Sequence, residues 1–325
     1  MPEIIVVDVT NRCNLNCKHC LKNINDMGGS GTADIDLHLL DRVLTEAEVL
    51  KTRIVSMTGG EPTLHNDWEG LIAVMEKHDV DYTFVTNGIN FKEACKVLIR
   101  GATQSFRGVS FSIDGATAET NDSMRGEGTF EKVMGALRLA RMHGIPFSIQ
   151  SVVGRHNLNE LSQIAELADE AGAIELNYMM MRPTHENVEH LLSPLQSDEA
   201  EEQIKSIKES HKRLKVTMTA VNKTPYPLFV CRPLAMSMIS IDHHGYLRFC
   251  PDLTNYRAAG ADDTDVIVDL NTKPLHIALK DLSNRINRFW HNKIDWVTEG
   301  IVDTTEYEPC SYCLSHFGKY ECKDM

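Results

Sequence analysis

The sequence predicts an α/β fold whose strands run parallel, and two observations support this. Short apolar segments alternate with amphipathic segments through the first two thirds of the 325-residue chain, as in strands joined by helical crossovers. The composition, 42% hydrophobic and 24% charged, is that of an ordinary globular protein, and the length is enough for one large α/β domain with an appendage or for two domains. Periodicity alone does not separate an open doubly wound sheet from a barrel.

The predicted elements follow one another in a regular order. Strands are expected at 4–9, 53–57, 81–86, 108–113, 146–153 and 173–179. Helices are expected at 36–50, 67–78, 91–100, 129–143 and 157–171. Cys95 lies on the apolar pattern of the helix at 91–100, so we expect its thiol in the core. A further helix at 198–215 mixes acidic with basic residues, which predicts a solvated face.

The last third of the chain has a different character. From Thr224 onward, Pro, aromatic residues, Asp and Cys become dense and helical patterns become sparse. A small, irregular module held together by metal is expected there. We therefore expect a first domain at 1–222 and a Cys-rich module at 223–325.

Charge and cysteine content disfavour several classes of protein. Lys and Arg number 33 against 46 Asp and Glu, a net charge of −13, which disfavours nucleic acid and anionic membranes as partners. The apolar runs are too short to span a bilayer, and no basic segment of a signal peptide is present at the N-terminus. A cytoplasmic protein is expected, and in that reducing compartment its nine cysteines indicate metal or redox sites.

The most specific motif is a Cys-x3-Cys-x2-Cys arrangement directly after the first strand, formed by Cys13, Cys17 and Cys20. Such a loop can wrap three thiolates around one small inorganic cluster, and three ligands leave one coordination position open for chemistry. The alternative is a zinc knuckle. Its fourth ligand would have to come from another part of the chain, because His19 is poorly placed to be that ligand.

This motif resembles the signature of the radical S-adenosylmethionine (SAM) superfamily, although His19 stands where an aromatic residue is common. The resemblance implies a partial parallel (β/α)6 TIM-like barrel in which Cys13, Cys17 and Cys20 hold a [4Fe–4S] cluster at the carboxyl ends of the strands. It also implies SAM bound to the open iron, reductive cleavage to a 5′-deoxyadenosyl radical, and removal of a substrate hydrogen. A reductase of flavodoxin or ferredoxin type is the implied electron donor.

Gly59, Gly60, Glu61 and Pro62 follow the second strand. The two glycines leave room for a close approach by a ligand, and Pro62 ends the extended run. An ordinary turn is the alternative. In the radical SAM family a Gly-Gly-Glu-Pro motif contacts the amino group of SAM, and the carboxylate of Glu61 suits an ammonium partner.

Polar residues also lie near the ends of the later strands. Ligand contacts in a barrel are one interpretation, and helix caps and turns are the other. The resemblance implies contacts with the ribose and carboxylate of SAM for Asn87, Ser112, Asp114 and Gln150. Met179 either packs on the adenine or belongs to the core. The segment 121–126 resembles a His-Asp-x-x-Arg-Gly segment of relatives with extra clusters, with Asn121 in place of His.

A second group of cysteines comprises Cys231, Cys250, Cys310 and Cys313. A hairpin that turns at Gly245 would bring the first two together. Four thiolates can close either a structural zinc site or an auxiliary [4Fe–4S] cluster, and spacing alone leaves both open. The Cys-x13-Gly-x4-Cys run resembles the opening of SPASM and twitch extensions of radical SAM enzymes, which implies one auxiliary cluster in a twitch-type module.

The resemblance implies an oxidoreductase that dehydrogenates or cross-links an unactivated C–H position of a peptide or small metabolite, with the auxiliary cluster as electron acceptor. If Cys322 donates a hydrogen atom instead, the enzyme is an epimerase of a peptide, a sugar or an aminocyclitol. The alternatives are that Cys322 is an idle chain end or that it replaces one of the four cysteine ligands. An iron–sulfur electron carrier is a non-enzymatic hypothesis, disfavoured because a carrier needs no SAM site. Because Cys13 lies in the first loop, no leader-binding domain is expected before the barrel. This weakens the hypothesis that the substrate is a leader-bearing peptide.

Overall fold

The computed structural model describes residues 2–22, 33–101, 103–184, 186–219, 228–254, 256, 264–299 and 309–320. Their strands form one sheet in the order β10-β9-β8-β1-β2-β3-β4-β5-β6-β7. The strands are β1 Ile4–Thr10, β2 Ile54–Gly59, β3 Asp81–Thr86, β4 Phe106–Ser112, β5 Phe147–Val153, β6 Glu175–Met180, β7 Lys215–Thr219, β8 Met238–Ile241, β9 Tyr246–Arg248 and β10 Val266–Asp269.

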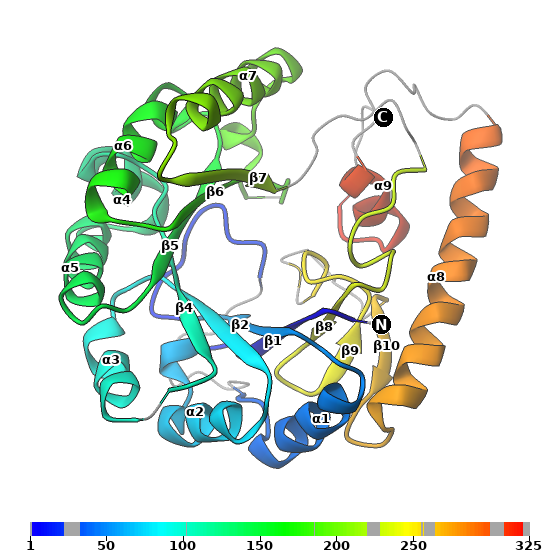
Figure 1. Cartoon of the computed structure of the whole chain (residues 1–325). Helices are drawn as coiled ribbons and strands as arrows, with labels where there is room; N and C mark the ends of the chain where they lie inside the picture. The colour runs from blue at the N-terminus through cyan, green and yellow to red at the C-terminus, as the bar shows by residue number, and fades with distance from the viewer. Residues whose placement is uncertain are drawn as a thin grey trace.

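The helices lie outside this sheet. They are α1 Leu37–Val49, α2 Trp68–Lys77, α3 Phe91–Arg100, α4 Ala118–Arg125, α5 Thr129–Met142, α6 Leu161–Ala171, α7 Pro194–Ser210, α8 Leu275–Thr298 and α9 Pro309–His316, with short 3-10 turns at Pro62–Leu64, Leu158–Glu160 and Val188–His190. Figure 1 shows α1 to α7 following one another around the convex side of the curved sheet. None of the helices in the described ranges is long and apolar enough to cross a membrane.

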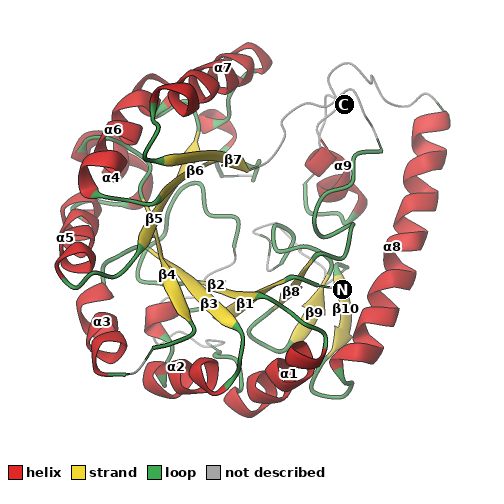
Figure 2. Ribbon diagram, in the orientation of Figure 1, coloured by secondary structure: helices red, strands yellow, loops and turns green. Residues whose placement is uncertain are grey.

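The strand order confirms the partial barrel. From β1 to β7 each strand pairs in parallel with the next, so the sheet has no reversal of order of the kind a doubly wound fold needs. Figure 2 shows the strands bending around a central space, with α1 to α7 on the outside. An open barrel with helices on one face is the result.

The two faces of the sheet differ in exposure. Along β5 and β6 buried and half-buried residues alternate, as the twofold period of a strand requires. The buried residues face the helices: Phe84 meets Trp68 of α2, and the Tyr178 hydroxyl donates to the backbone oxygen of Leu161 in α6. The half-buried residues face the interior and include the polar Ser148, Gln150 and Asn177. Cys95 is buried in α3, as predicted.

Four expectations about the elements are corrected. The last third is not poor in helices: α8 runs from Leu275 to Thr298, with apolar residues every three or four positions from Leu275 to Phe289 facing inward. The helix expected at 198–215 begins earlier, at a Ser193 capping box, and ends at Ser210. Lys215 instead begins β7, a seventh parallel strand. α4 was also not predicted.

The C-terminal segment continues the sheet of the barrel. β8 pairs in parallel with β1, and β9 and β10 follow as antiparallel strands. The predicted hairpin is confirmed, with Gly245 at φ +84° between β8 and β9. The predicted boundary between 222 and 223 lies outside the described residues, so the division into two domains stays a prediction.

Buried charges hold this hairpin to its neighbours. Arg248 of β9 is buried between Asp242 and Asp265, with Nη2 2.6 Å from Asp242 Oδ2 and Nη1 3.5 Å from Asp265 Oδ1. Lys319 Nζ lies 2.7 Å from the same Asp265 oxygen. These ion pairs connect β9 to the segments on either side of it.

Candidate active site

The cysteine loop leaves the carboxyl end of β1 and is held from two sides. The backbone NH of Lys18 donates to the carbonyl of Met124 in α4 at 3.0 Å, and Cys20 NH donates to the carbonyl of Cys17 at 3.0 Å. Cys17 is buried, whereas Cys13 and Cys20 are half-buried, and no disulfide joins these three. The loop therefore presents three thiols within one short, well-anchored turn.

The electrostatics of these thiols show that they lie near one another. Burial is the largest cause that raises the pKa of Cys13 to about 12, and Glu61, Cys17 and Cys20 contribute to the same rise. Burial raises the pKa of Cys17 to about 11, while the Arg125 guanidinium opposes this shift. Thiols that resist ionisation when alone become thiolates when an iron–sulfur cluster binds, because the metal stabilises their charge.

The donor set suits a [4Fe–4S] cluster, which cysteine thiolates hold in proteins. Within the described ranges, no three His, Cys, Asp or Glu side chains converge closely enough to bind a single metal ion. Each cysteine thiolate that holds a four-iron cluster binds a different iron, so such convergence is not required there. Cys13, Cys17 and Cys20 would hold the cluster.

Gly59 and Gly60 are required by the cysteine loop itself. The NH groups of Gly60 and Glu61 donate to the carbonyls of Thr10 and Arg12, both at 2.7 Å. A Cβ on Gly60 would lie 2.0 Å from the Arg12 oxygen, and one on Gly59 would lie 2.3 Å from the Thr10 oxygen. The backbone of the cysteine loop is thus one group that approaches these glycines closely, and their contact with a ligand stays a prediction.

Glu61 is buried and its carboxylate is oriented by neighbours. Oε1 accepts hydrogen bonds from the hydroxyls of Thr63 at 2.6 Å and Thr86 at 2.7 Å, and Oε2 accepts from the NH of Asn87 at 2.7 Å. Burial nevertheless raises the pKa of Glu61. Asn87 in turn donates through Nδ2 to Oδ1 of Asn14 in the cysteine loop, at 2.8 Å. The end of β3 therefore fixes both Glu61 and the loop.

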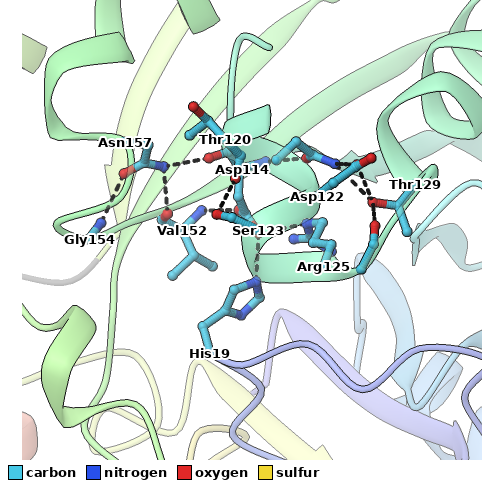
Figure 3. A network of polar contacts seen from close by, with 12 residues as sticks. His19, Asp114, Thr120, Asp122, Ser123, Arg125, Thr129, Val152, Gly154 and Asn157 are labelled. Carbon is cyan, nitrogen blue, oxygen red and sulfur yellow. Dashed lines mark hydrogen bonds and ion pairs between the residues drawn. The ribbon is translucent and has the colours of Figure 1, made fainter. Parts of the chain in front are cut away.

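Asp114 is the centre of a buried polar network shown in Figure 3. It follows β4, is fully buried, and its Oδ2 lies 2.6 Å from Nε2 of His19 and 2.6 Å from Nε of Arg125. Its Oδ1 accepts a hydrogen bond from the NH of Val152 at 2.7 Å. Burial acts to raise the pKa of Asp114, but Arg125 and His19 outweigh it and hold the pKa well below its usual range.

The segment 121–126 packs beside this carboxylate and hydrogen-bonds to its backbone. Asn121 accepts a hydrogen bond from the NH of Asp114 and donates to Asp122 and Thr129. Asp122 caps the start of α5 by accepting from the NH groups of Gly128 and Phe130. The amide of Asn121 thus fills the place expected for a histidine with a neutral group that bonds on both sides.

The remaining predicted residues line the interior of the sheet. Ser112, Gln150 and Asn177 are register partners on β4, β5 and β6 and form one half-buried row. Asn177 was missed by the sequence analysis, although it occupies the same alternating position on β6 as Gln150 on β5. Met179 lies two residues further along this face and is half-buried, whereas Met180 is buried.

His156 is a second residue that the sequence did not single out. It follows β5, and neither ring nitrogen has a hydrogen-bond partner among the described residues. Burial lowers the pKa of His156 to about 4, and the charges of Asp114 and His19 act on it as well. His156 therefore stands beside the Asp114 network as a neutral ring with unused donor and acceptor capacity.

The four cysteines of the second group come together as predicted. Burial raises the pKa of Cys250 well above its usual value, and Cys231, Cys310 and Cys313 each raise it further. They come from the segment before β8, the end of β9 and α9. These four half-buried thiols suit a [4Fe–4S] cluster, in which each cysteine binds a different iron, but they do not converge on the position of a single zinc ion. Cys322 lies outside the described residues.

Lys22 connects the two cysteine groups. Its Nζ lies 2.8 Å from Asp8 Oδ2 on β1 and 3.1 Å from the carbonyl oxygen of Pro251, which follows Cys250. Its backbone also bridges to Tyr256, whose hydroxyl donates to the carbonyl oxygen of Pro183 beyond β6. The first cysteine loop is therefore packed directly against the segment that carries Cys250.

A fold of this kind with this loop defines a radical SAM protein, and the comparison with known families agrees. The model of the radical SAM superfamily matches residues 7–168. The chain belongs to the radical SAM superfamily.

Individual relatives and solved structures resemble the chain over different lengths. Mycofactocin maturase MftC of Mycobacterium ulcerans is 34% identical over 184 residues, 56% of this chain and 48% of that protein. PqqA peptide cyclase of Ruegeria pomeroyi is 28% identical over 177 residues, 54% of this chain and 46% of that protein. The chain thus spans about half the length of these curated relatives. Streptococcus suis SuiB bound to S-adenosylmethionine has the same fold, with a TM-score of 0.70 and 13% identity over 85% of this chain and 65% of that one.

Proposed function

We propose that the chain is a radical SAM enzyme that oxidatively modifies an unactivated C–H position of a peptide. One observation carries the proposal: the cysteine loop, Glu61 and the Asp114 network meet at the carboxyl ends of parallel strands, beside a polar and half-buried interior face. When bound, a [4Fe–4S] cluster and SAM would supply the 5′-deoxyadenosyl radical that removes a hydrogen atom from the substrate.

The residues of the chain would bind and orient SAM. Glu61 Oε2 accepts one hydrogen bond from Asn87, and a carboxylate oxygen can accept a second from an ammonium group such as that of SAM. The row of Ser112, Gln150 and Asn177 offers hydroxyl and amide groups to the ribose, the carboxylate or the substrate. Met179 lies at the end of this row and would pack on the adenine.

We further propose that residues 223–325 form a twitch-type module in which Cys231, Cys250, Cys310 and Cys313 hold an auxiliary [4Fe–4S] cluster. The contact of Lys22 with Pro251 supports this arrangement, because it joins the two cysteine groups through a short protein path. The auxiliary centre would take up the electron that the substrate radical loses, so that the net reaction is a two-electron oxidation. A flavodoxin or ferredoxin would deliver the electron that starts each turnover.

A peptide is the proposed substrate because of the relatives. PqqA peptide cyclase is named for a peptide, and SuiB has been crystallised with its precursor peptide SuiA. A precursor peptide encoded beside this chain is therefore the first candidate, with small metabolites as the other outcome of a substrate search. A mass loss of two hydrogens per turnover would support oxidation.

The first test measures iron, sulfide and zinc after anaerobic reconstitution, together with SAM cleavage under dithionite. About eight iron and eight sulfide per chain with SAM cleavage would support two clusters. About four iron and one zinc would instead make the second cysteine group structural. Iron-loaded protein that neither binds nor cleaves SAM would overturn the proposal and favour an electron carrier.

One matched pair of variants and two single variants separate the roles of the cysteines. Cys17→Ala should abolish formation of 5′-deoxyadenosine, whereas Cys95→Ala, which alters a core thiol of α3, should retain it. Cys313→Ala should retain SAM cleavage and lose product. The epimerase alternative predicts one deuterium per product in D2O and a loss of product in Cys322→Ala; unchanged product from that variant would exclude it.

A further inference from the structure

Lys293 is a lysine in an unusual position. It lies near the end of α8, and only 1% of its surface is exposed. Its Nζ is 5.4 Å from the ring centroid of Trp290, 5.5 Å from that of Tyr312 and 6.0 Å from that of Phe289. Lysine is almost never fully buried unless a charge or an aromatic face compensates its ammonium group.

The aromatic residues around Lys293 belong to the wall of the second cysteine group. Tyr312 lies on α9 between Cys310 and Cys313, and Phe289 of α8 packs edge-on against it at 5.4 Å between ring centroids. Figure 1 shows α9 beside α8 on the side that faces the barrel. The side chain of Lys293 therefore points from α8 toward the helix that carries two of the four cysteines.

The electrostatics of the group agree with this geometry. Cys313, Cys231 and Cys310 favour the charged form of Lys293, although burial is the largest effect and lowers its pKa. Conversely, Lys293 favours the thiolate forms of Cys231 and Cys313. The other charges that act on these cysteines are Asp252, which opposes ionisation of Cys250, and Arg182, which favours that of Cys313.

A centre with four thiolates has a negative overall charge, and one-electron reduction makes it more negative by one unit. A nearby buried cation stabilises the reduced form more than the oxidised form, because the attraction grows with the charge and little water screens it. Lys293 supplies such a cation at a site from which solvent is excluded.

We propose that Lys293 raises the reduction potential of the auxiliary centre held by Cys231, Cys250, Cys310 and Cys313, and thereby poises that centre to accept the electron of the substrate radical. This inference rests on the proposed auxiliary [4Fe–4S] cluster. An auxiliary cluster held there would take the one electron that the substrate radical loses, and the oxidised substrate would release a proton. The cluster would then pass the electron to the first cluster or to an oxidised flavodoxin or ferredoxin.

The test is a redox titration of the reconstituted full-length chain, followed by electron paramagnetic resonance. Three variants are compared with the unchanged protein: Lys293→Met, Lys293→Arg and Lys280→Met, the last at an exposed position of the same helix. The same three variants are also made in protein that carries Cys17→Ala. Because the first cluster is then absent, the remaining paramagnetic resonance signal belongs to the auxiliary centre.

Lys293→Met should decrease the equilibrium constant for reduction of the auxiliary centre at least tenfold. For a one-electron couple, a tenfold decrease lowers the midpoint potential by about 59 mV. Lys293→Arg should stay near the unchanged value because it keeps the positive charge, and Lys280→Met should not shift it. An unchanged potential in Lys293→Met, with full iron content, would overturn the inference while the proposed function stands.

Two further outcomes are also decisive. If Lys293→Met loses iron, the Lys293→Arg variant tests the inference. The inference is supported if Lys293→Arg keeps the auxiliary centre at the potential of the unchanged protein. If Lys293→Arg also loses iron, Lys293 is a structural residue and the inference is overturned. If the unchanged protein itself holds only one cluster, the proposed auxiliary centre fails, and the inference fails with it before any variant is compared.

Discussion

His19 and Asp114, 95 residues apart in the chain, lie within 2.6 Å of each other between Nε2 and Oδ2. One belongs to the cysteine loop after β1 and the other follows β4, so this contact ties the candidate cluster site to the far side of the curved sheet. Arg125 completes the arrangement from α4, on the same carboxylate oxygen. This buried carboxylate is therefore one of the contacts that position the cysteine loop.

Asp114→Asn should destabilise the protein and impair the cysteine loop. The substitution leaves Arg125 buried without its negative partner, and breaking a buried ion pair costs about 3–5 kcal/mol. We expect this loss in urea unfolding and reduced iron incorporation. Asp81→Asn, whose ion pair with Arg107 is exposed, should change stability by less than about 1 kcal/mol. Equal effects of the two substitutions would contradict the role assigned to Asp114.

Gly60→Ala should displace the cysteine loop. The new Cβ would meet the Arg12 carbonyl oxygen at 2.0 Å, so the backbone on one side must move. We expect a loss of iron binding and a lower unfolding temperature. Gly135→Ala in α5 is the matched control, because its Cβ would meet nothing closer than 3.8 Å. It should be neutral or stabilising by up to about 1 kcal/mol. Normal iron content in Gly60→Ala would refute the close-approach explanation.

Protonation of Asp122 at acid pH should lower the stability of the fold. Burial acts to raise its pKa, but hydrogen bonds from Phe130, Asn121, Thr129 and Gly128 outweigh it and lower the pKa. The carboxylate therefore stabilises the fold above its ordinary pKa of about 4, and this contribution disappears as the pH falls below that value. In urea unfolding between pH 3 and pH 6, Asp122→Asn should be less stable than the unchanged protein at pH 6, and the difference should shrink toward pH 3. A constant difference would exclude this titration.

Arg248→Met should unfold the hairpin of β8 and β9 more readily. Arg248 is buried between Asp242 and Asp265, and its removal leaves both carboxylates without that cation. We expect a loss of about 3–5 kcal/mol, measured by denaturant unfolding, and faster hydrogen exchange at β9. Removing an exposed partner instead, by Arg107→Met, should cost less than about 1 kcal/mol. A stability equal to that of the unchanged protein would show that the ion pairs of Arg248 contribute nothing net.

The sequence predicted the first six strands and most helices because their patterns are local. Alternating apolar residues along β5, and the periodic apolar face of α3, are set by residues a few positions apart. β7 was missed because its five residues are largely exposed at the edge of the sheet and carry little apolar signal. α8 was missed although its apolar spacing is regular, because dense cysteine and proline residues nearby suggested an irregular module.

For the site, the chemistry of the donors could be predicted from local patterns: three thiols on one short loop, a carboxylate after two glycines, and four more thiols near the C-terminal end. These residues are close in the chain or have characteristic spacing, so their pattern is visible without a fold. The other features of the site come from the folded chain. Its interior face is half-buried and polar, Asp114 joins His19 to Arg125, and Lys22 and Lys293 lie beside the cysteine groups. Such contacts join residues far apart in the chain, and their energies depend on burial and on the direction of each side chain, which no local pattern encodes.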